Sequence, residues 1–148
     1  MATPSVSPAP SLQLKRTFKA ARQRVFQAWT EPEQMKHWSA PTDEYEINAE
    51  IDLRVGGSYR IQMKHVSGRV SVAYGEYREV QPPEKLVYTW AWEDGSVTGT
   101  LVTVEFRDLG EETEVLLTHE RFVDAEWRDK HNQGWSGCLV RLEKYLAG

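Results

Sequence analysis

The sequence predicts an α+β domain in which a curved seven-stranded antiparallel sheet wraps around one long C-terminal helix. Between residues 45 and 121, apolar and polar residues alternate and short turns interrupt the pattern, as in half-buried antiparallel strands. Residues 124–148 instead carry apolar residues at steps of three and four, the spacing of an amphipathic helix. Each apolar face has only the other to bury against. A strongly bent sheet cannot follow a straight helix along its full length, so we expect a cavity at one end of the groove unless large side chains fill it.

The first part of the chain divides into a tail, a strand and two short helices. Residues 1–11 contain three of the seven prolines and one branched aliphatic residue, so we expect a disordered tail and assign the domain to residues 12–148. Residues 12–18 alternate as a strand does. Helical spacing over 20–30 predicts a first helix, and a proline in its first turn favours a second one over 32–37.

Six strands are predicted to follow in a meander, because every connection between them is short. Glycine and proline clusters mark their ends, and one side of each strand is apolar. The expected strands are 44–51, a strand containing 59–63, 69–80, a strand containing 86–92, one containing 102–106 and one containing 115–121.

The C-terminal helix is predicted to begin after Asp124, a suitable N-cap residue. Gly134 and Gly137 lie inside it, where each glycine costs about 1 kcal/mol relative to alanine. We therefore expect the surroundings of the helix to require glycine at these positions. The alternatives are tight packing, a close approach of the sheet backbone, or room left for a ligand.

Composition excludes several classes of partner. The net charge is −4, whereas nucleic-acid binding needs a clustered positive surface. No apolar run approaches the roughly 20 residues that cross a bilayer, so we expect no membrane insertion. The N-terminus lacks the order of a signal peptide and Cys138 is the single cysteine, which predicts a cytoplasmic location.

The sequence carries no catalytic or metal-binding motif of the GxSxG, HExxH or CxxC kind, so we assign no catalytic residue, metal or cofactor. The four histidines lack metal-ligand spacing. His119 shares strand parity with Val115 and Leu117 and should point at the helix, where it would meet His131. A buried histidine of this kind is either a hydrogen-bonded core residue or a general acid or base.

Six tryptophans and six tyrosines in a short chain either fill the core or line a pocket for a planar ligand. The residues predicted to line such a site share the inward faces of the strands and the terminal helix. They are Trp38, Tyr59, Ile61, Met63, Tyr88, Trp90, Trp92, Val102, Leu117, His119, Trp127, His131, Trp135 and Cys138.

Four stretches together carry a family resemblance: 55–60 (VGGSYR), 75–90 (GEYREVQPPEKLVYTW), 113–119 (TEVLLTH) and 134–135 (GW). In this order and spacing the chain resembles the START-like (SRPBCC) superfamily, in the branch of the activator of Hsp90 ATPase homologue (AHSA1-like). The resemblance covers about residues 12–147. It implies a helix-grip (START/Bet v 1-like) fold with a deep cavity, which the superfamily uses for hydrophobic ligands.

We therefore expect the protein to bind a small hydrophobic or aromatic ligand between sheet and helix, without a cofactor. One alternative is an enzyme of the cyclase or hydrolase kind, in which His119 or Tyr88 acts as acid or base. The other is a stress-response module that partners the Hsp90 chaperone. Monomer and homodimer both stay open.

Overall fold

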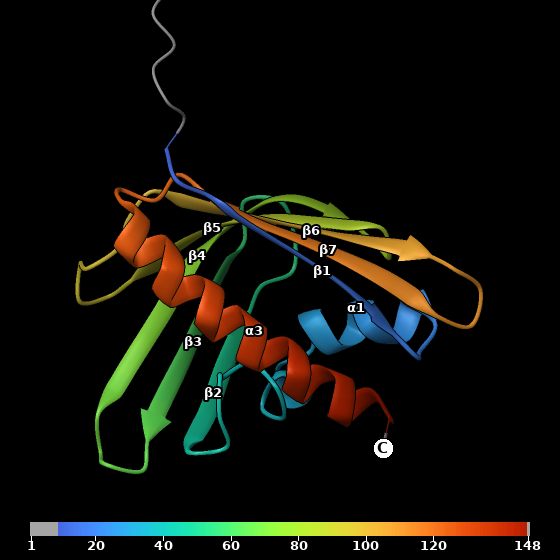
Figure 1. The fold of residues 1–148 in the computed structure, drawn as a ribbon, viewed down its shortest axis with the longest axis horizontal. Coiled ribbons are helices and arrows are strands. Elements are labelled where there is room, and N and C mark those ends of the chain that lie inside the picture. Colours follow the sequence, from blue (N-terminus) through green and yellow to red (C-terminus); the bar gives the residue numbers. More distant parts are fainter. Residues whose placement is uncertain (1–8, 148) are drawn as a thin grey trace, which may run out of the picture.

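The computed structural model describes residues 9–147, which form seven strands and three helices (Figure 1). The predicted order of elements is confirmed; both short helices are somewhat shorter than expected. The elements are β1 (Leu12–Phe18), α1 (Arg22–Thr30), α2 (Pro32–Met35), β2 (Tyr45–Ile51), β3 (Ser58–His65), β4 (Val70–Gln81), β5 (Lys85–Trp92), β6 (Thr100–Asp108), β7 (Thr113–Glu120) and α3 (Ala125–Ala147).

All seven strands form one antiparallel sheet, in the order β1-β7-β6-β5-β4-β3-β2. Strands β2 to β7 follow one another as a meander, and β1 joins the far edge by pairing with β7, from Leu12 opposite His119 to Phe18 opposite Thr113. The predicted tail lies for its greater part, residues 1–8, outside the described chain. Next to it, the Pro10 carbonyl accepts a hydrogen bond from the backbone N–H of Phe122.

The sheet bends sharply, so that β2, β3 and β4 run across the direction of β1, β6 and β7 (Figure 1). Strand β4 carries two irregularities near this bend. Its pairing with β5 shifts register between Tyr77 and Glu79, and such a bulge increases local twist. At Gly75 a Cβ would stand 2.0 Å from the Thr89 carbonyl oxygen, so only glycine permits this close approach of β4 to β5.

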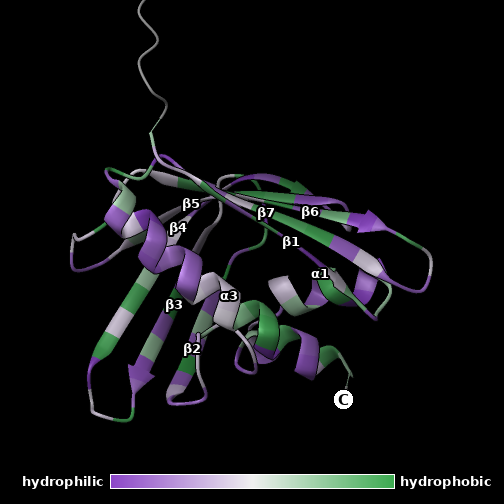
Figure 2. Ribbon diagram, viewed as in Figure 1, coloured by the Kyte–Doolittle hydropathy of each residue, from purple (hydrophilic) through white to green (hydrophobic). Residues whose placement is uncertain are grey.

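Helix α3 lies across the concave face (Figure 1). The hydrophobic core draws residues from all three helices and all seven strands. Figure 2 shows mainly hydrophilic residues along the first half of α3 and a mixture of hydrophobic and hydrophilic residues along the second. Leu139 and Leu142 of that second half are buried, and burial of such a side chain contributes about 1.5–3 kcal/mol. The fully buried residues of β6 and β7 include Val102, Val104, Val115 and Leu117.

The start of α3 is capped as predicted, because the Asp124 carboxylate accepts a hydrogen bond from the backbone N–H of Trp127 at 3.0 Å. The prediction that the last strand extends to residue 121 is wrong. Strand β7 ends at Glu120, and Arg121 adopts the left-handed conformation (φ 71°) with its side chain exposed. In the part of the chain that is described, no helix is both long enough and apolar enough to span a bilayer.

Candidate ligand-binding cavity

A cavity of about 490 Å³ lies between α3 and strands β2 to β5, with α1 and α2 at its inner end. This volume lies within the range of small-molecule sites. Apolar and aromatic side chains form most of its wall. The lining residues are Trp29, Met35, Trp38, Ser39, Pro41, Tyr45, Ile51, Tyr59, Ile61, Met63, Arg69, Ser71, Tyr77, Tyr88, Trp90, Trp92, Asp94, Ser96, Trp127, Lys130, His131, Gly134, Trp135 and Cys138.

The structure brings most of the sequence-predicted site residues to this one cavity. They come from the segment after α2, from β3, from β5 and from α3. Their role in ligand binding stays a prediction. The predicted residues that line the cavity are Trp38, Tyr59, Ile61, Met63, Tyr88, Trp90, Trp92, Trp127, His131, Trp135 and Cys138.

Val102, Leu117 and His119 lie elsewhere, fully buried in the core and not at the cavity wall. Their inward orientation agrees with their strand parity. In this half of the sheet, however, α3 lies close to β1 and α1 lies close to β6, and the inward side chains of β6 and β7 are buried. The strands that line the cavity are β2 to β5. Strand parity alone does not distinguish these strands from β1, β6 and β7.

The sequence interpretation missed several lining residues: Trp29 of α1, Met35 of α2, Tyr45 and Ile51 of β2, and Tyr77 of β4. Ile51 has the parity of other inward β2 residues, and Tyr77 has that of Ala73, so alternation carried a usable signal for both. For the helical residues no such signal existed, because an apolar helix face does not tell core from cavity.

Trp90 occupies the centre of the aromatic wall. Its ring centroid lies 5.3 Å from that of Trp135, 5.5 Å from that of Trp92 and 6.4 Å from that of Tyr59. Aromatic pairs attract one another at such separations. Within residues 9–147 the buried Nε1–H of Trp90 has no hydrogen-bond partner.

His119 is held in one tautomer by its neighbours. The Nε1–H of Trp135 donates to Nδ1 of His119 at 3.0 Å. The Thr100 hydroxyl donates its proton to the Trp90 carbonyl at 2.6 Å, so its oxygen accepts from Nε2–H of His119 at 2.9 Å. Burial lowers the pKa of His119 to about 2. Both ring nitrogens are therefore engaged in a neutral core residue, and the geometry gives no support to its use as an acid or base.

His131 makes a second histidine–tryptophan pair. Its Nδ1–H donates to the Trp127 carbonyl at 2.8 Å, and its Nε2 accepts from Nε1–H of Trp92 at 3.0 Å. Burial lowers its pKa as well, although the bond to Trp127 acts in the opposite direction. The rings of His119 and His131 lie 5.2 Å apart, so the two histidines meet between sheet and helix as their positions indicated. Together they fix the orientations of Trp92 and Trp135 in the cavity wall.

Cys138 lies on the buried face of α3 at the cavity wall. Burial raises the pKa of its thiol to about 12, which Arg141 only partly offsets. A thiol that stays protonated at neutral pH is a poor nucleophile. Across the described chain, no group of three or more histidine, cysteine, aspartate or glutamate side chains is arranged to hold a metal ion.

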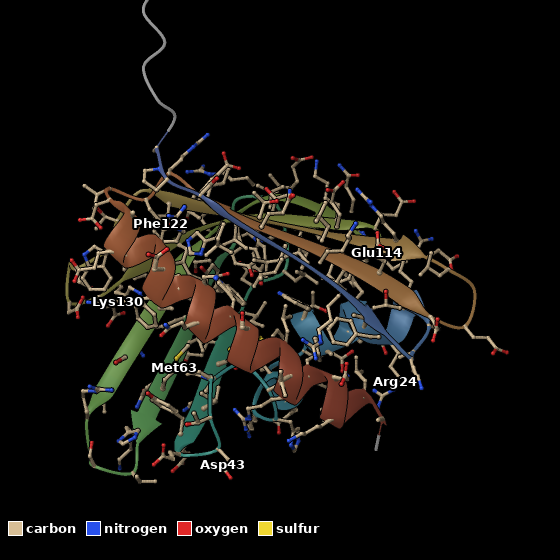
Figure 3. All side chains as sticks on the ribbon, viewed as in Figure 1. Arg24, Asp43, Met63, Glu114, Phe122 and Lys130 are labelled. Carbon is tan, nitrogen blue, oxygen red and sulfur yellow. The ribbon has the colours of Figure 1, made fainter. Side chains whose placement is uncertain are left out.

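The cavity mouth is polar. Its exposed lining residues are Arg69, Asp94 and Lys130, the last labelled in Figure 3 on the first half of α3. The ammonium group of Lys130 lies 4.5 Å from the centre of the Trp127 ring, and the Asp94 carboxylate accepts two hydrogen bonds from Ser96. Charge therefore stays at the solvent edge, and the interior is aromatic.

Gly134 and Gly137 occupy positions in α3 where glycine serves different structural purposes. A Cβ on Gly137 would stand 2.6 Å from the Pro41 carbonyl oxygen, so the helix there approaches the backbone of the segment after α2 rather than that of the sheet. A Cβ on Gly134 would meet nothing within 4 Å, and Gly134 lines the cavity. Gly137 thus permits close packing, whereas Gly134 leaves room.

A family model described as Activator of Hsp90 ATPase homolog 1-like protein matches residues 19–147. The chain therefore belongs to this family, a branch of the START-like superfamily, whose fold is typical of ligand-binding proteins. A search of curated proteins finds no match.

Solved structures share the whole fold. A protein of Chromobacterium violaceum is 24% identical with a TM-score of 0.82, over 93% of this chain and 97% of that one. An AHSA1 protein of Silicibacter pomeroyi is 25% identical with a TM-score of 0.80, over 93% and 98%. A putative uncharacterized protein of Rhizobium leguminosarum is 26% identical with a TM-score of 0.79, over 93% and 94%.

Proposed function

We propose that this protein binds a small, largely hydrophobic or aromatic ligand in the cavity between the sheet and α3, without covalent chemistry. The observation that carries the proposal is the cavity itself, which is lined by tryptophan and tyrosine and is not filled by the protein's own side chains. Binding would remove apolar surface of both ligand and wall from water, which contributes about 25 cal/mol per Å².

Gly134 supports the proposal independently. Glycine inside a helix costs about 1 kcal/mol relative to alanine, and no neighbouring atom lies close enough to require it. The space that this glycine leaves belongs to the cavity.

The rigidity of the wall supports it too. The hydrogen bonds from Trp92 to His131 and from Trp135 to His119 hold two large rings in place before any ligand arrives. A preorganised wall lowers the entropic cost of binding.

The test is a tryptophan fluorescence titration with the rigid aromatic compounds fluorene and 9-fluorenone, because the cavity wall contains several tryptophans. Gly134→Leu places a side chain in the cavity, and we expect it to weaken binding at least tenfold. Asn132→Leu adds the same side chain on the exposed side of the same helix and should leave binding unchanged. Equal binding by wild type and Gly134→Leu would contradict the proposed site.

Native mass spectrometry of freshly purified protein complements the titration. We expect a bound small molecule in wild type and Asn132→Leu that is missing from Gly134→Leu. A molecule that remains on all three variants would be bound elsewhere.

The two alternative functions receive no specific support. His119 does not line the cavity, and burial raises the pKa of Tyr88 well above its ordinary range, which leaves a hydrogen-bond donor rather than a base. A role beside the Hsp90 chaperone stays a prediction of the family resemblance.

A further inference from the structure

We propose that the ligand carries a neutral hydrogen-bond-acceptor oxygen, such as a ketone or quinone carbonyl, which binds the hydroxyl groups of Tyr77 and Tyr88. This inference rests on the proposed function, because it specifies the ligand of the same cavity. The remaining aromatic wall would hold the body of the ligand.

Three tyrosines stand side by side on the concave face, one each from β3, β4 and β5. The ring centroids of Tyr59 and Tyr88 lie 5.2 Å apart, those of Tyr59 and Tyr77 5.7 Å, and those of Tyr77 and Tyr88 5.8 Å. Tyr77 and Tyr88 also pair directly across the two strands. All three line the cavity and are almost fully buried.

The hydroxyl groups of the three tyrosines differ in the hydrogen bonds that they make within the protein. The Tyr59 hydroxyl donates to the Thr89 carbonyl at 2.5 Å, so its proton is used. The Tyr88 hydroxyl accepts a hydrogen bond from Nε1–H of Trp29 at 3.3 Å, which leaves its own proton without an acceptor in residues 9–147. The Tyr77 hydroxyl makes no hydrogen bond within the same residues. Two adjacent O–H donors are therefore available inside the cavity.

The charge state of the site favours a neutral acceptor. Burial raises the pKa of both Tyr77 and Tyr88 well above the ordinary range, so both stay protonated and can donate. The cationic side chains of the described lining, Arg69 and Lys130, are exposed at the mouth. A carboxylate at the tyrosine pair would be buried without a counter-ion, which is strongly unfavourable.

A carbonyl oxygen fits what the two tyrosines offer. It is neutral and has two lone pairs, so it accepts one hydrogen bond from each hydroxyl. The buried Nε1–H of Trp90 is likewise a donor without a partner in the described chain, so the unpartnered polar groups of this wall are donors. A wall of unpaired donors discriminates against ligands that lack an acceptor, because the donors would then stay unsatisfied.

The experiment compares 9-fluorenone with fluorene, two rigid compounds of the same shape that differ by one carbonyl group. Both dissociation constants are measured by fluorescence titration for wild type, Tyr77→Phe and Tyr74→Phe. Tyr74 lies on the same strand but is exposed outside the cavity, so Tyr74→Phe is the matched control. Because fluorene and fluorenone differ in solubility, the quantity compared is the ratio of their dissociation constants.

We expect Tyr77→Phe to reduce the preference for 9-fluorenone about three- to tenfold, the range for one neutral hydrogen bond, while fluorene binding stays unchanged. Tyr74→Phe should keep the wild-type ratio. The Tyr77 hydroxyl has no partner in residues 9–147, so its removal should not impair folding. Tyr88→Phe should act in the same direction, but it also removes the acceptor of Trp29, so its folding is verified by circular dichroism.

Infrared spectroscopy supplies an independent measurement. The carbonyl stretch of bound 9-fluorenone should lie at lower frequency in wild type than in Tyr77→Phe, since a hydrogen bond weakens the C=O bond. If both compounds bind and neither the ratio nor the frequency changes in Tyr77→Phe, the inference is overturned while the proposed function stands. If neither compound binds wild type, both are overturned.

Discussion

Individual buried polar residues hold the aromatic side chains of the hydrophobic cavity in place. His119 and His131 are neutral, and each uses one ring nitrogen to accept from a tryptophan of the cavity wall and the other to donate. An apolar residue in either position would leave an indole N–H buried without a partner, at a cost of about 1–3 kcal/mol. Polarity here orients the wall rather than performing chemistry.

The lowered pKa of His119 predicts acid sensitivity. Above pH 6.5 His119 is neutral in both the folded and the unfolded chain. Below that value the unfolded chain binds a proton, whereas the folded protein does not until about pH 2, so the free energy of unfolding decreases as pH falls. Between pH 6.5 and about 4.5 the loss amounts to about 2 kcal/mol. Urea denaturation at a series of pH values measures it.

His119→Gln is the control for this pH dependence, since glutamine can donate and accept hydrogen bonds but does not titrate. Relative to the variant, wild type should lose stability with a slope of about 1.4 kcal/mol per pH unit below pH 6.5. Parallel curves for the two proteins would show that His119 does not carry the effect. Ring-proton NMR of wild type should likewise show no titration of His119 near neutrality.

Cys138 gives a second prediction at this scale. With the pKa of its thiol raised from 9.0 to about 12, the thiolate fraction at pH 8 falls about 10³-fold. Alkylation by iodoacetamide should therefore be at least that much slower in the folded protein than in 8 M urea. Mass spectrometry of quenched samples measures the two rates. Comparable rates would mean that the thiol is reached by solvent.

At the scale of helices and strands, the sequence allowed the element order to be predicted because local periodicity reports which side of each element is apolar. Val102, Leu117 and His119 show the limit of that information. They have the predicted inward orientation, yet they are buried in the core and do not line the cavity, whereas Tyr77 on another strand does. Which half of a bent sheet a helix covers depends on distant contacts and on irregularities such as the Gly75 approach, and periodicity does not encode either.

The two glycines of α3 permit a paired prediction about this element. Gly134→Ala should stabilise the protein by up to about 1 kcal/mol, because the helix gains propensity and the added methyl group meets no atom within 4 Å. Gly137→Ala should destabilise it by about 1–3 kcal/mol despite the same gain, because the methyl group would overlap the Pro41 backbone. Chemical denaturation of both variants measures the difference. Similar values for the two would show that α3 does not press on that segment.

At the scale of the whole molecule, α3 divides the concave face into two regions. In one region the inward residues of β6 and β7 are buried in the core, whereas in the other the residues of β2 to β5 line the cavity. The first half of α3 and strands β2 and β3 therefore face each other across space that a ligand would occupy. We infer that a ligand would couple these two parts of the molecule.

Hydrogen exchange with and without saturating 9-fluorenone tests this coupling. A ligand at 100 times its dissociation constant stabilises the bound state by about 2.7 kcal/mol. Amides of β2, β3 and the first half of α3 that exchange by local opening should slow about 100-fold, because opening there would release the ligand. Amides of β1 that open locally should be unaffected, since the described cavity lining includes no residue of that strand. Slowing in β1 equal to that in β2 and β3 would instead place the ligand against both halves of the sheet.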